Sequence, residues 1–219
     1  MPDYRWRFNN ALHPNLICYY DMSTLTPGGL MKNLASTGSV YDGVINGTLT
    51  LANPLIRAKR TKCMDFDGAT NYLSLANPIN GLTAFTVLFW TNLDAWDSTW
   101  FSRAGAAATF TYINGNGSVV IRYTATGAIA SQKTPISTTR MICTVINASV
   151  QSLIYIDGKR TIDTGTIPGA NPADANAKIG AYWDNSLKLN GRLDNIMFFN
   201  VALDAQKINA LFRSASPRM

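Results

Sequence analysis

Short apolar or alternating segments recur along the whole chain, and polar stretches separate them. Each segment holds four to eight residues, which is the usual length of a β-strand and too short for most helices. Twelve segments have this pattern: residues 16–20, 44–51, 63–66, 72–75, 85–91, 99–103, 109–113, 119–123, 141–146, 153–156, 177–182 and 193–199. The pattern predicts a protein built from many short strands.

Residues that favour tight turns lie between these segments. They are Asp67-Gly68, Asn80-Gly81, residues 114–117, Asp157-Gly158 and Asn190-Gly191. Many short strands joined by such turns, with no helical pattern between them, are typical of an antiparallel sandwich or jelly roll. The predicted fold is therefore all-β, with two antiparallel sheets packed in a jelly-roll sandwich.

The segment 85–91 is apolar on both faces of the predicted strand. Phe85, Val87 and Phe89 lie on one face, while Leu88 and Trp90 lie on the other. A strand of this kind has no face to offer to water, so we expect it in the middle of a sheet covered on both sides.

One helix is predicted, close to the C-terminus. Asp204 has the side chain of a helix N-cap. Ile208, Leu211 and Phe212 follow at the spacing that places three side chains on one helical face. We expect this short helix to pack its apolar face on the sandwich.

The acidic residues carry the strongest functional exclusion. All 13 are aspartates, so the chain has no glutamate, and His13 is the single histidine. Glutamate-based acid–base catalysis and multi-histidine zinc sites are excluded. Only 15% of the residues are charged, which fits a strand-rich chain better than a helical one.

The formal net charge of +6 is spread along the chain except for a basic run at residues 57–62. Such a run can meet phosphate or an acidic surface, but a solvated loop is the more economical interpretation. No aromatic residue lies among these charges, so the stacking half of a single-strand nucleic-acid site is missing. We expect no nucleic-acid partner.

The N-terminal residues contain no apolar core of a signal peptide, and no apolar run reaches the length of a membrane span. We therefore expect neither secretion nor a membrane partner. Cys18, Cys63 and Cys143 each lie in an apolar strand-like segment, and their spacing matches no metal motif. We expect three buried free thiols, as suits assembly in a reducing cytoplasm.

Four segments, taken in order, resemble the concanavalin A-like lectin/glucanase superfamily, in particular its laminin G-like and pentraxin-like jelly-roll domains. They are residues 16–21, residues 64–68 with 71–75, residues 155–159, and residues 178–180 leading into 190–196 and the final helix. The resemblance spans about residues 15–213. It implies two packed antiparallel sheets and a lectin-like binding module, although a fold alone does not identify the ligand.

The resemblance also bears on catalysis. Glucanases of this superfamily use a pair of glutamates, as retaining glycosidases need two nearby carboxyl groups. Asp94 and Asp97 are the nearest substitute pair in this chain. Because their neighbours are turn-forming, we interpret them as loop-capping or metal-ligating groups, and we expect no enzyme.

Laminin G-like and pentraxin-like relatives often hold Ca²⁺ at the rim of the sandwich, through hard oxygen ligands. The candidate ligands here are Asp65, Asp67, Asn71, Asp94 and Asp97, with Asp184 and Asn185 as further rim oxygens. The alternative is that each caps its own turn. The fold requires no cofactor, and Ca²⁺ is the one expected candidate.

Sugar sites combine an aromatic platform with a few hydrogen-bonding groups. The candidate glycan-binding residues are Tyr182, Trp183, Asp184 and Asn185 in one loop, and Trp96 in another. The alternative is that the aromatic residues close the core. We expect the core role for Trp90 and Trp100 and leave both roles open for Trp183.

Arg5, Trp6, Arg7 and Phe8 form a cationic and aromatic arm, with the residue types that anchor protein interfaces. We expect an arm at residues 1–14, a sandwich at 15–213 and a tail at 214–219. This organisation predicts a non-enzymatic subunit of a virus or phage particle, either a capsid decoration or a tail component. Its partners would be virion proteins, further copies of itself and, in some cases, cell-surface glycans. The alternative is a stand-alone carbohydrate-binding lectin.

Overall fold

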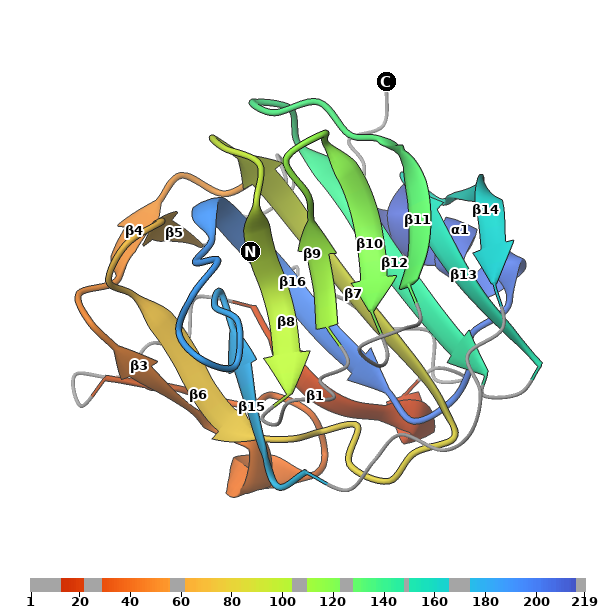
Figure 1. Ribbon diagram of the computed structural model, residues 1–219. Helices are drawn as coiled ribbons and strands as arrows, with labels where there is room; N and C mark the ends of the chain where they lie inside the picture. Colours follow the sequence, from red (N-terminus) through yellow and green to blue (C-terminus); the bar gives the residue numbers. More distant parts are fainter. Residues whose placement is uncertain are drawn as a thin grey trace, which may run out of the picture.

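The computed structural model describes residues 13–21, 29–55, 62–103, 110–122, 128–147, 150–165 and 174–215. These residues form two packed antiparallel sheets, a pair of short 3₁₀ turns and one helix (Figure 1). The all-β sandwich predicted from the sequence is confirmed. The arm residues Arg5, Trp6, Arg7 and Phe8 lie outside the described residues.

One sheet, here called the β7 sheet, has the strand order β14-β13-β12-β7-β16-β5-β4, and β1 pairs with the second half of β16. Its strands are β1 (Leu16–Tyr20), β4 (Thr50–Ala52), β5 (Cys63–Asp67), β7 (Ala84–Leu93), β12 (Arg140–Asn147), β13 (Gln151–Ile156), β14 (Lys159–Gly165) and β16 (Asn190–Phe199).

The other sheet, here called the β8 sheet, has the order β11-β10-β9-β8-β15-β6-β3-β2 and lies in front of the β7 sheet in Figure 1. Its strands are β2 (Leu30–Met31), β3 (Gly43–Asn46), β6 (Tyr72–Ala76), β8 (Ser98–Arg103), β9 (Phe110–Ile113), β10 (Ser118–Arg122), β11 (Ala128–Lys133) and β15 (Asn176–Ile179). The short turns are η1 (His13–Asn15) and η2 (Gly38–Tyr41), and the helix is α1 (Ala205–Ala215).

The main core lies between the two sheets. Phe89 of β7 packs against Trp100 of β8, with ring centroids 5.1 Å apart. Trp100 also donates a hydrogen bond from Nε1 to Thr91 Oγ1 at 3.1 Å. Phe101 and Phe198 meet edge to face at 5.0 Å. Large aromatic side chains from both sheets thus join the layers, as expected for a closely packed sandwich.

A second apolar cluster covers the outer face of the β7 sheet. Ile208 and Leu211 of α1 are buried there against Leu88 and Trp90. Asp204 caps the helix, since its Oδ1 accepts the N–H of Lys207 at 2.8 Å. These observations confirm the capped helix and the strand 85–91 with two buried faces.

The three cysteines are free and buried, as predicted. Burial raises the pKa of the Cys63 thiol to about 11, and it raises the pKa of Cys18 and Cys143 further. No helix among the described residues is long and apolar enough to cross a membrane.

Two predicted strands need correction. The segment 44–51 is not one strand, because Gly47 turns the chain at a φ of +76° between β3 and β4, which belong to different sheets. A Cβ atom at Gly47 would lie 2.7 Å from the Thr70 carbonyl oxygen. The predicted strand 177–182 ends at Ile179, and the chain then enters a loop at Gly180.

Candidate functional site

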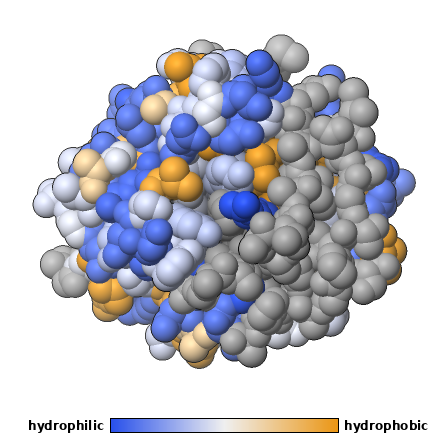
Figure 2. Space-filling model, in the orientation of Figure 1, coloured by the Kyte–Doolittle hydropathy of each residue, from blue (hydrophilic) through white to orange (hydrophobic). Residues whose placement is uncertain are grey.

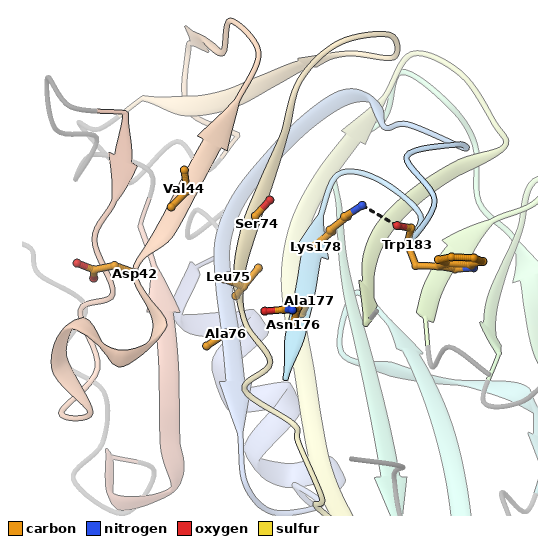
Figure 3. A pocket seen from close by; sticks show the side chains of 9 residues that line it. All are labelled: Asp42, Val44, Ser74, Leu75, Ala76, Asn176, Ala177, Lys178 and Trp183. Atoms are coloured by element: carbon orange, nitrogen blue, oxygen red, sulfur yellow. Dashed lines mark hydrogen bonds between the residues drawn. The ribbon is translucent and has the colours of Figure 1, made fainter. Parts of the chain in front are cut away.

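An open groove of about 480 Å³ lies on the outer face of the β8 sheet, over strands β3, β6 and β15 (Figure 3). Alternate residues of these strands, such as Leu73 and Ile179, point inward to the core. The groove is lined by Asp42, Val44, Ser74, Leu75, Ala76, Asn176, Ala177, Lys178 and Trp183. Figure 2, in the same orientation as Figure 1, shows mainly hydrophilic residues with scattered apolar ones over this part of the surface.

Strand register aligns the central side chains of the groove. Val44 on β3 lies opposite Ser74 on β6, and Ser74 lies opposite Lys178 on β15. Asn46 is on the same face as Val44 and donates from Nδ2 to Ser74 Oγ at 2.7 Å. An apolar, a hydroxyl and a cationic side chain therefore form one row across three strands.

Trp183 lies at one end of the groove, in the loop that joins β15 to β16. The loop starts at Gly180, whose φ is +84°. A Cβ atom there would lie 2.4 Å from the ring of Phe66, so glycine is required by both conformation and space. The Tyr182 N–H donates to Ser186 O, and the Asn185 N–H donates to Tyr182 O, each at 2.9 Å. These bonds close the turn that carries Trp183.

Asp184 stabilises the same turn from within. Its Oδ1 accepts the Ser186 hydroxyl at 2.5 Å and the Ser186 N–H at 2.8 Å. The hydroxyl and the N–H lower the pKa of the Asp184 carboxyl. The carboxylate is therefore a structural acceptor in this turn.

Lys178 holds the turn against the sheet. Its Nζ donates to the Trp183 carbonyl oxygen at 2.6 Å and to Asn185 Oδ1 at 2.7 Å, and it lies 5.2 Å from the centre of the Tyr72 ring. Figure 3 shows the lysine side chain reaching the main chain of Trp183, while the indole extends beyond it. Burial lowers the pKa of Lys178, and nearby Asp184 opposes that effect.

Asp42 is the second charged residue of the groove. Its Oδ2 accepts Lys32 Nζ at 2.6 Å, and its Oδ1 accepts the Asn33 N–H at 2.9 Å. Partial burial by itself raises the pKa of this carboxyl, but the hydrogen bonds from Lys32 and Asn33 outweigh it and lower the pKa. Both charged groups of the groove therefore bind partners within the protein.

The structure brings together four of the five predicted glycan-binding residues. Tyr182, Trp183, Asp184 and Asn185 share the turn beside the groove, and the Trp183 side chain is 37% exposed. Trp96 is 42% exposed but lies in the loop between β7 and β8, where its ring covers Gly117. Glycan binding by these residues stays a prediction.

Trp90 and Trp100 are buried, which confirms their predicted core role.

Three of the five predicted calcium ligands, Asp65, Asp67 and Asn71, bind other groups of the protein. Asp67 Oδ1 accepts the N–H groups of Ala69 and Thr70, each at 2.8 Å, and Asp65 forms an ion pair with Arg192 at 3.6 Å. Asn71 donates to the Thr48 carbonyl oxygen.

Asp94 and Asp97 lie in the Trp96 loop, and Asp97 has a φ of +56°. Within the described part of the chain, no three His, Cys or Asp side chains form a group that could hold a metal. Calcium binding stays a prediction.

Sequence reasoning missed the floor of the groove. Ser74, Asn176 and Lys178 are polar residues that alternate with buried ones on β6 and β15. That alternation marked them as outward-facing, and it is the one signal in the sequence that pointed to them. Their proximity depends on β15 pairing with β6, about 100 residues away in the chain.

A family model described as the Concanavalin A-like lectin/glucanases superfamily (Laminin G 3) matches residues 67–209. No curated protein sequence matches the chain at a significant level.

Solved structures share the fold at low sequence identity. Domain 4 of an extracellular arabinanase from Geobacillus stearothermophilus, in complex with arabinotriose, superposes with a TM-score of 0.71 and 16% identity, covering 90% of this chain and 98% of that one. The binding domain of Paraclostridial Mosquitocidal Protein 1 gives 0.72 and 16%, covering 93% and 53%.

A botulinum neurotoxin type C structure, whose title describes cell entry dependent on two ganglioside molecules, gives 0.71 and 12%, covering 94% and 53%. The chain thus spans about half the length of these two toxin structures. At these identities the likeness establishes the fold alone.

Proposed function

The chain belongs to the Concanavalin A-like lectin/glucanases superfamily, and from that premise we propose that it is a carbohydrate-binding module without hydrolytic activity. The proposed binding site is the groove over β3, β6 and β15, with Trp183 as its aromatic platform. A sugar would pack its C–H face on the indole and direct its hydroxyl groups to the polar side chains of the strands.

The observation that carries the proposal is the juxtaposition of an exposed tryptophan with a groove lined by both polar and apolar side chains. Trp183 is 37% exposed although large aromatic residues are normally buried. The turn that carries Trp183 is held by Lys178, which donates to the Trp183 carbonyl oxygen and to Asn185 Oδ1. A scaffold that keeps a costly apolar ring at the end of an open groove provides a surface for a ligand with both C–H and O–H groups.

The groove is unsuited to glycoside hydrolysis. Retaining and inverting glycosidases place two carboxyl groups on either side of the scissile bond. Among the described lining residues Asp42 is the one carboxylate, and it accepts hydrogen bonds from Lys32 and Asn33. Laminarin, agarose and arabinan should remain uncut.

Structural relatives add support of a general kind. The arabinanase domain was solved with a bound arabinotriose. The same sandwich can therefore hold a short oligosaccharide in another protein, and the wider superfamily includes lectins. This support concerns the class of ligand and does not locate its site.

Affinity electrophoresis tests the proposal directly. The protein is run through native gels that contain arabinan, arabinogalactan, laminarin, dextran or polygalacturonate, and retardation measures binding. We expect at least one polymer to retard the wild type. Trp183→Ala should weaken that binding at least tenfold, because an aromatic residue that anchors a ligand contributes more than about 1.4 kcal/mol.

Trp96→Ala is the matched control, because Trp96 is similarly exposed but lies outside the groove. It should leave the retardation unchanged. Loss of binding in Trp96→Ala with retention in Trp183→Ala would move the site to the other loop. If neither this panel nor a glycan array detects binding, the proposed function is wrong.

The expected role as a virion or phage subunit stays a prediction. Its main support was the arm with Arg5, Trp6, Arg7 and Phe8, which lies outside the described residues. Lectin-like binding is compatible with such a role, since a particle subunit can bind surface glycans. Adjacent capsid or tail genes would support it.

A further inference from the structure

We infer that Lys178 is a positioning residue that holds the Trp183 turn in place, and that the groove consequently selects neutral sugars over sugars that carry a carboxylate. The inference rests on the proposed function, because it concerns the ligand class of the same site. It depends on the hydrogen-bond partners of the two charged groups of the groove, Lys178 and Asp42.

The Lys178 ammonium has three N–H donors and no acceptor. Two of its acceptors are supplied by the turn, the Trp183 carbonyl oxygen at 2.6 Å and Asn185 Oδ1 at 2.7 Å. The Tyr72 ring lies 5.2 Å away, within the range of a cation–π contact. The turn thus engages two of the three N–H groups of the ammonium, and a sugar carboxylate would compete with the turn for this cation.

A second lysine stabilises the same turn from its other end. Lys188 Nζ donates to the Asn185 carbonyl oxygen at 2.6 Å. Asn185 therefore receives one cation on its side chain and another on its main chain. Two charged groups act on Lys178 from this turn, Asp184 with the opposite sign and Lys188 with the same sign. The two lysines act as internal supports of an exposed turn, so an anion that bound them would compete with these bonds.

The negative group of the groove is engaged in the same manner. Asp42 accepts Lys32 at one oxygen and the Asn33 main chain at the other. Both charged groups of the lining have partners within the protein, Lys178 in the turn and Asp42 in the segment that follows β2. A charged ligand would therefore have to compete with these partners for either group.

Uncharged groups remain for the ligand. The Ser74 hydroxyl and the Asn176 carboxamide are partly or fully exposed, and Val44, Ala76 and Trp183 supply apolar surface. Hydroxyl and carboxamide groups can both donate hydrogen bonds to sugar hydroxyls and accept hydrogen bonds from them. A carboxylate would lose its hydration and would gain Lys178 as a partner only at the expense of the bonds that hold the turn, which disfavours its binding.

The first experiment tests ligand selectivity on one polymer backbone. The polysaccharide with the strongest retardation is compared with the same polymer after partial carboxymethylation of its hydroxyl groups, with a hydroxyethylated sample as the neutral control for substitution. If the strongest binder is already acidic, it is compared with its carboxyl-reduced form. We expect the neutral form to bind at least tenfold more tightly in either case.

Equal or tighter binding of the acidic form would overturn the inference and leave the proposed function intact. A raised salt concentration provides a check, because binding of the neutral form should not change with ionic strength. A protein that binds neither form, nor any other glycan, would contradict the proposed function itself.

The second experiment tests the positioning role without a ligand. Hydrogen exchange is measured for the amides of residues 182–188 in the wild type, Lys178→Met and Lys178→Arg. We expect Lys178→Met to speed exchange of the Asn185 amide at least tenfold and to weaken glycan binding at least tenfold. Lys178→Arg keeps the charge and the donors, so it should restore part of both.

Ser74→Ala is the matched control, because Ser74 lies opposite Lys178 in the groove but makes no bond to the turn. It should weaken glycan binding while leaving exchange in the turn unchanged. If Lys178→Met leaves the exchange rates as in the wild type, Lys178 is not a positioning residue, whatever its effect on binding.

Discussion

The outer faces of the two sheets differ more than any other pair of regions in this molecule. The outer face of the β7 sheet is covered by α1, and Leu88, Trp90 and Met197 are buried beneath it. The outer face of the β8 sheet over β3, β6 and β15 stays open as the groove (Figures 1 and 3). The difference indicates that one outer face serves stability, whereas the other remains open and is the proposed binding face.

Residue choice explains the difference. Outward positions of the β7 sheet are apolar, so they gain free energy when α1 removes them from water. Trp90 even stacks on Phe212 of the helix at 5.7 Å. Outward positions of β6 and β15 include Ser74, Asn176 and Lys178. A covering element would bury those polar groups without compensation.

The covered face predicts the largest effect. Ile208 of α1 is fully buried in the outer cluster. Ile208→Ala should lower the free energy of unfolding by about 2 to 5 kcal/mol, the usual cost of removing a buried isoleucine side chain. Urea denaturation measures it. Gln206→Ala, an exposed change in the same helix, should have little effect, and glycan affinity should not change in either variant. A loss below about 1 kcal/mol in Ile208→Ala would show that the helix contributes little.

Gly180, which contacts the core residue Phe66 and begins the loop that carries Trp183, gives the next largest effect. Gly180→Ala should cost about 3 kcal/mol, roughly 1 for the left-handed backbone and roughly 2 for the clash of its Cβ with Phe66. Gly81→Ala is the matched control, because Gly81 has a φ of +69° but nothing within 4 Å of a Cβ. It should cost about 1 kcal/mol. Similar losses in both variants would show that the Phe66 contact is unimportant.

One identical substitution on both outer faces tests the comparison itself. Val145 is buried on the β7 sheet, while Val44 is 50% exposed beside the groove. Val145→Thr should cost about 2 kcal/mol, because the new hydroxyl is buried. Val44→Thr should stay within about 0.5 kcal/mol. Thermal unfolding of the two variants measures the difference, and equal losses would contradict the assignment of the two faces.

The rim turn at Asp67 gives the smallest effect and a pH dependence. Partial burial raises the pKa of Asp67, but hydrogen bonds from Thr70, Ala69 and Asn71 outweigh it and leave the pKa well below its usual range. Asp67→Ala should cost about 1 kcal/mol at neutral pH, as for a lost capping group. The Asp94 carboxyl makes no hydrogen bond or ion pair with another of the described residues, so Asp94→Ala should cost less than about 0.5 kcal/mol.

The sign of the pH effect follows from the lowered pKa. The contribution of Asp67 is fully present above the pKa of an unfolded aspartate, about 3.9, and is lost as the pH falls through the lower folded pKa. The stability difference between wild type and Asp67→Ala should therefore be constant from pH 7 to 5 and shrink below pH 4. A difference that grows on acidification would contradict the capping role.

Much of the fold was predictable because it depends on local signals. Short windows of sequence are enough to predict the strand at 85–91 with its two apolar faces, the Asp204 cap and the three buried cysteines. Strands β2, β11 and β14 were missed, since β2 has two residues and the other two carry polar residues in place of an apolar run. The single strand predicted at residues 44–51 was wrong although Asn46-Gly47 is itself a local turn signal, whereas the close approach of Thr70 to Gly47 is visible only in the structure.

The candidate site was predictable only in its loop. Trp183 and its neighbours were found because two aromatic and two polar residues, 182–185, are consecutive in the sequence. Asp42, Ser74 and Lys178 were not found, because each is an ordinary polar residue in its own segment. Their significance depends on hydrogen bonds that cross strands and loops.

The sequence by itself determined which faces of the longer strands are apolar, the turns outside residues 44–51 and 177–182, and that no glutamate chemistry is available. Tertiary structure alone decided that β15 lies between β6 and β8, which places Lys178 beside Ser74 and beneath the Trp183 turn. The physical reason is that a period-two pattern assigns a residue to a face of its strand, whereas strand neighbours are selected by packing across the whole core.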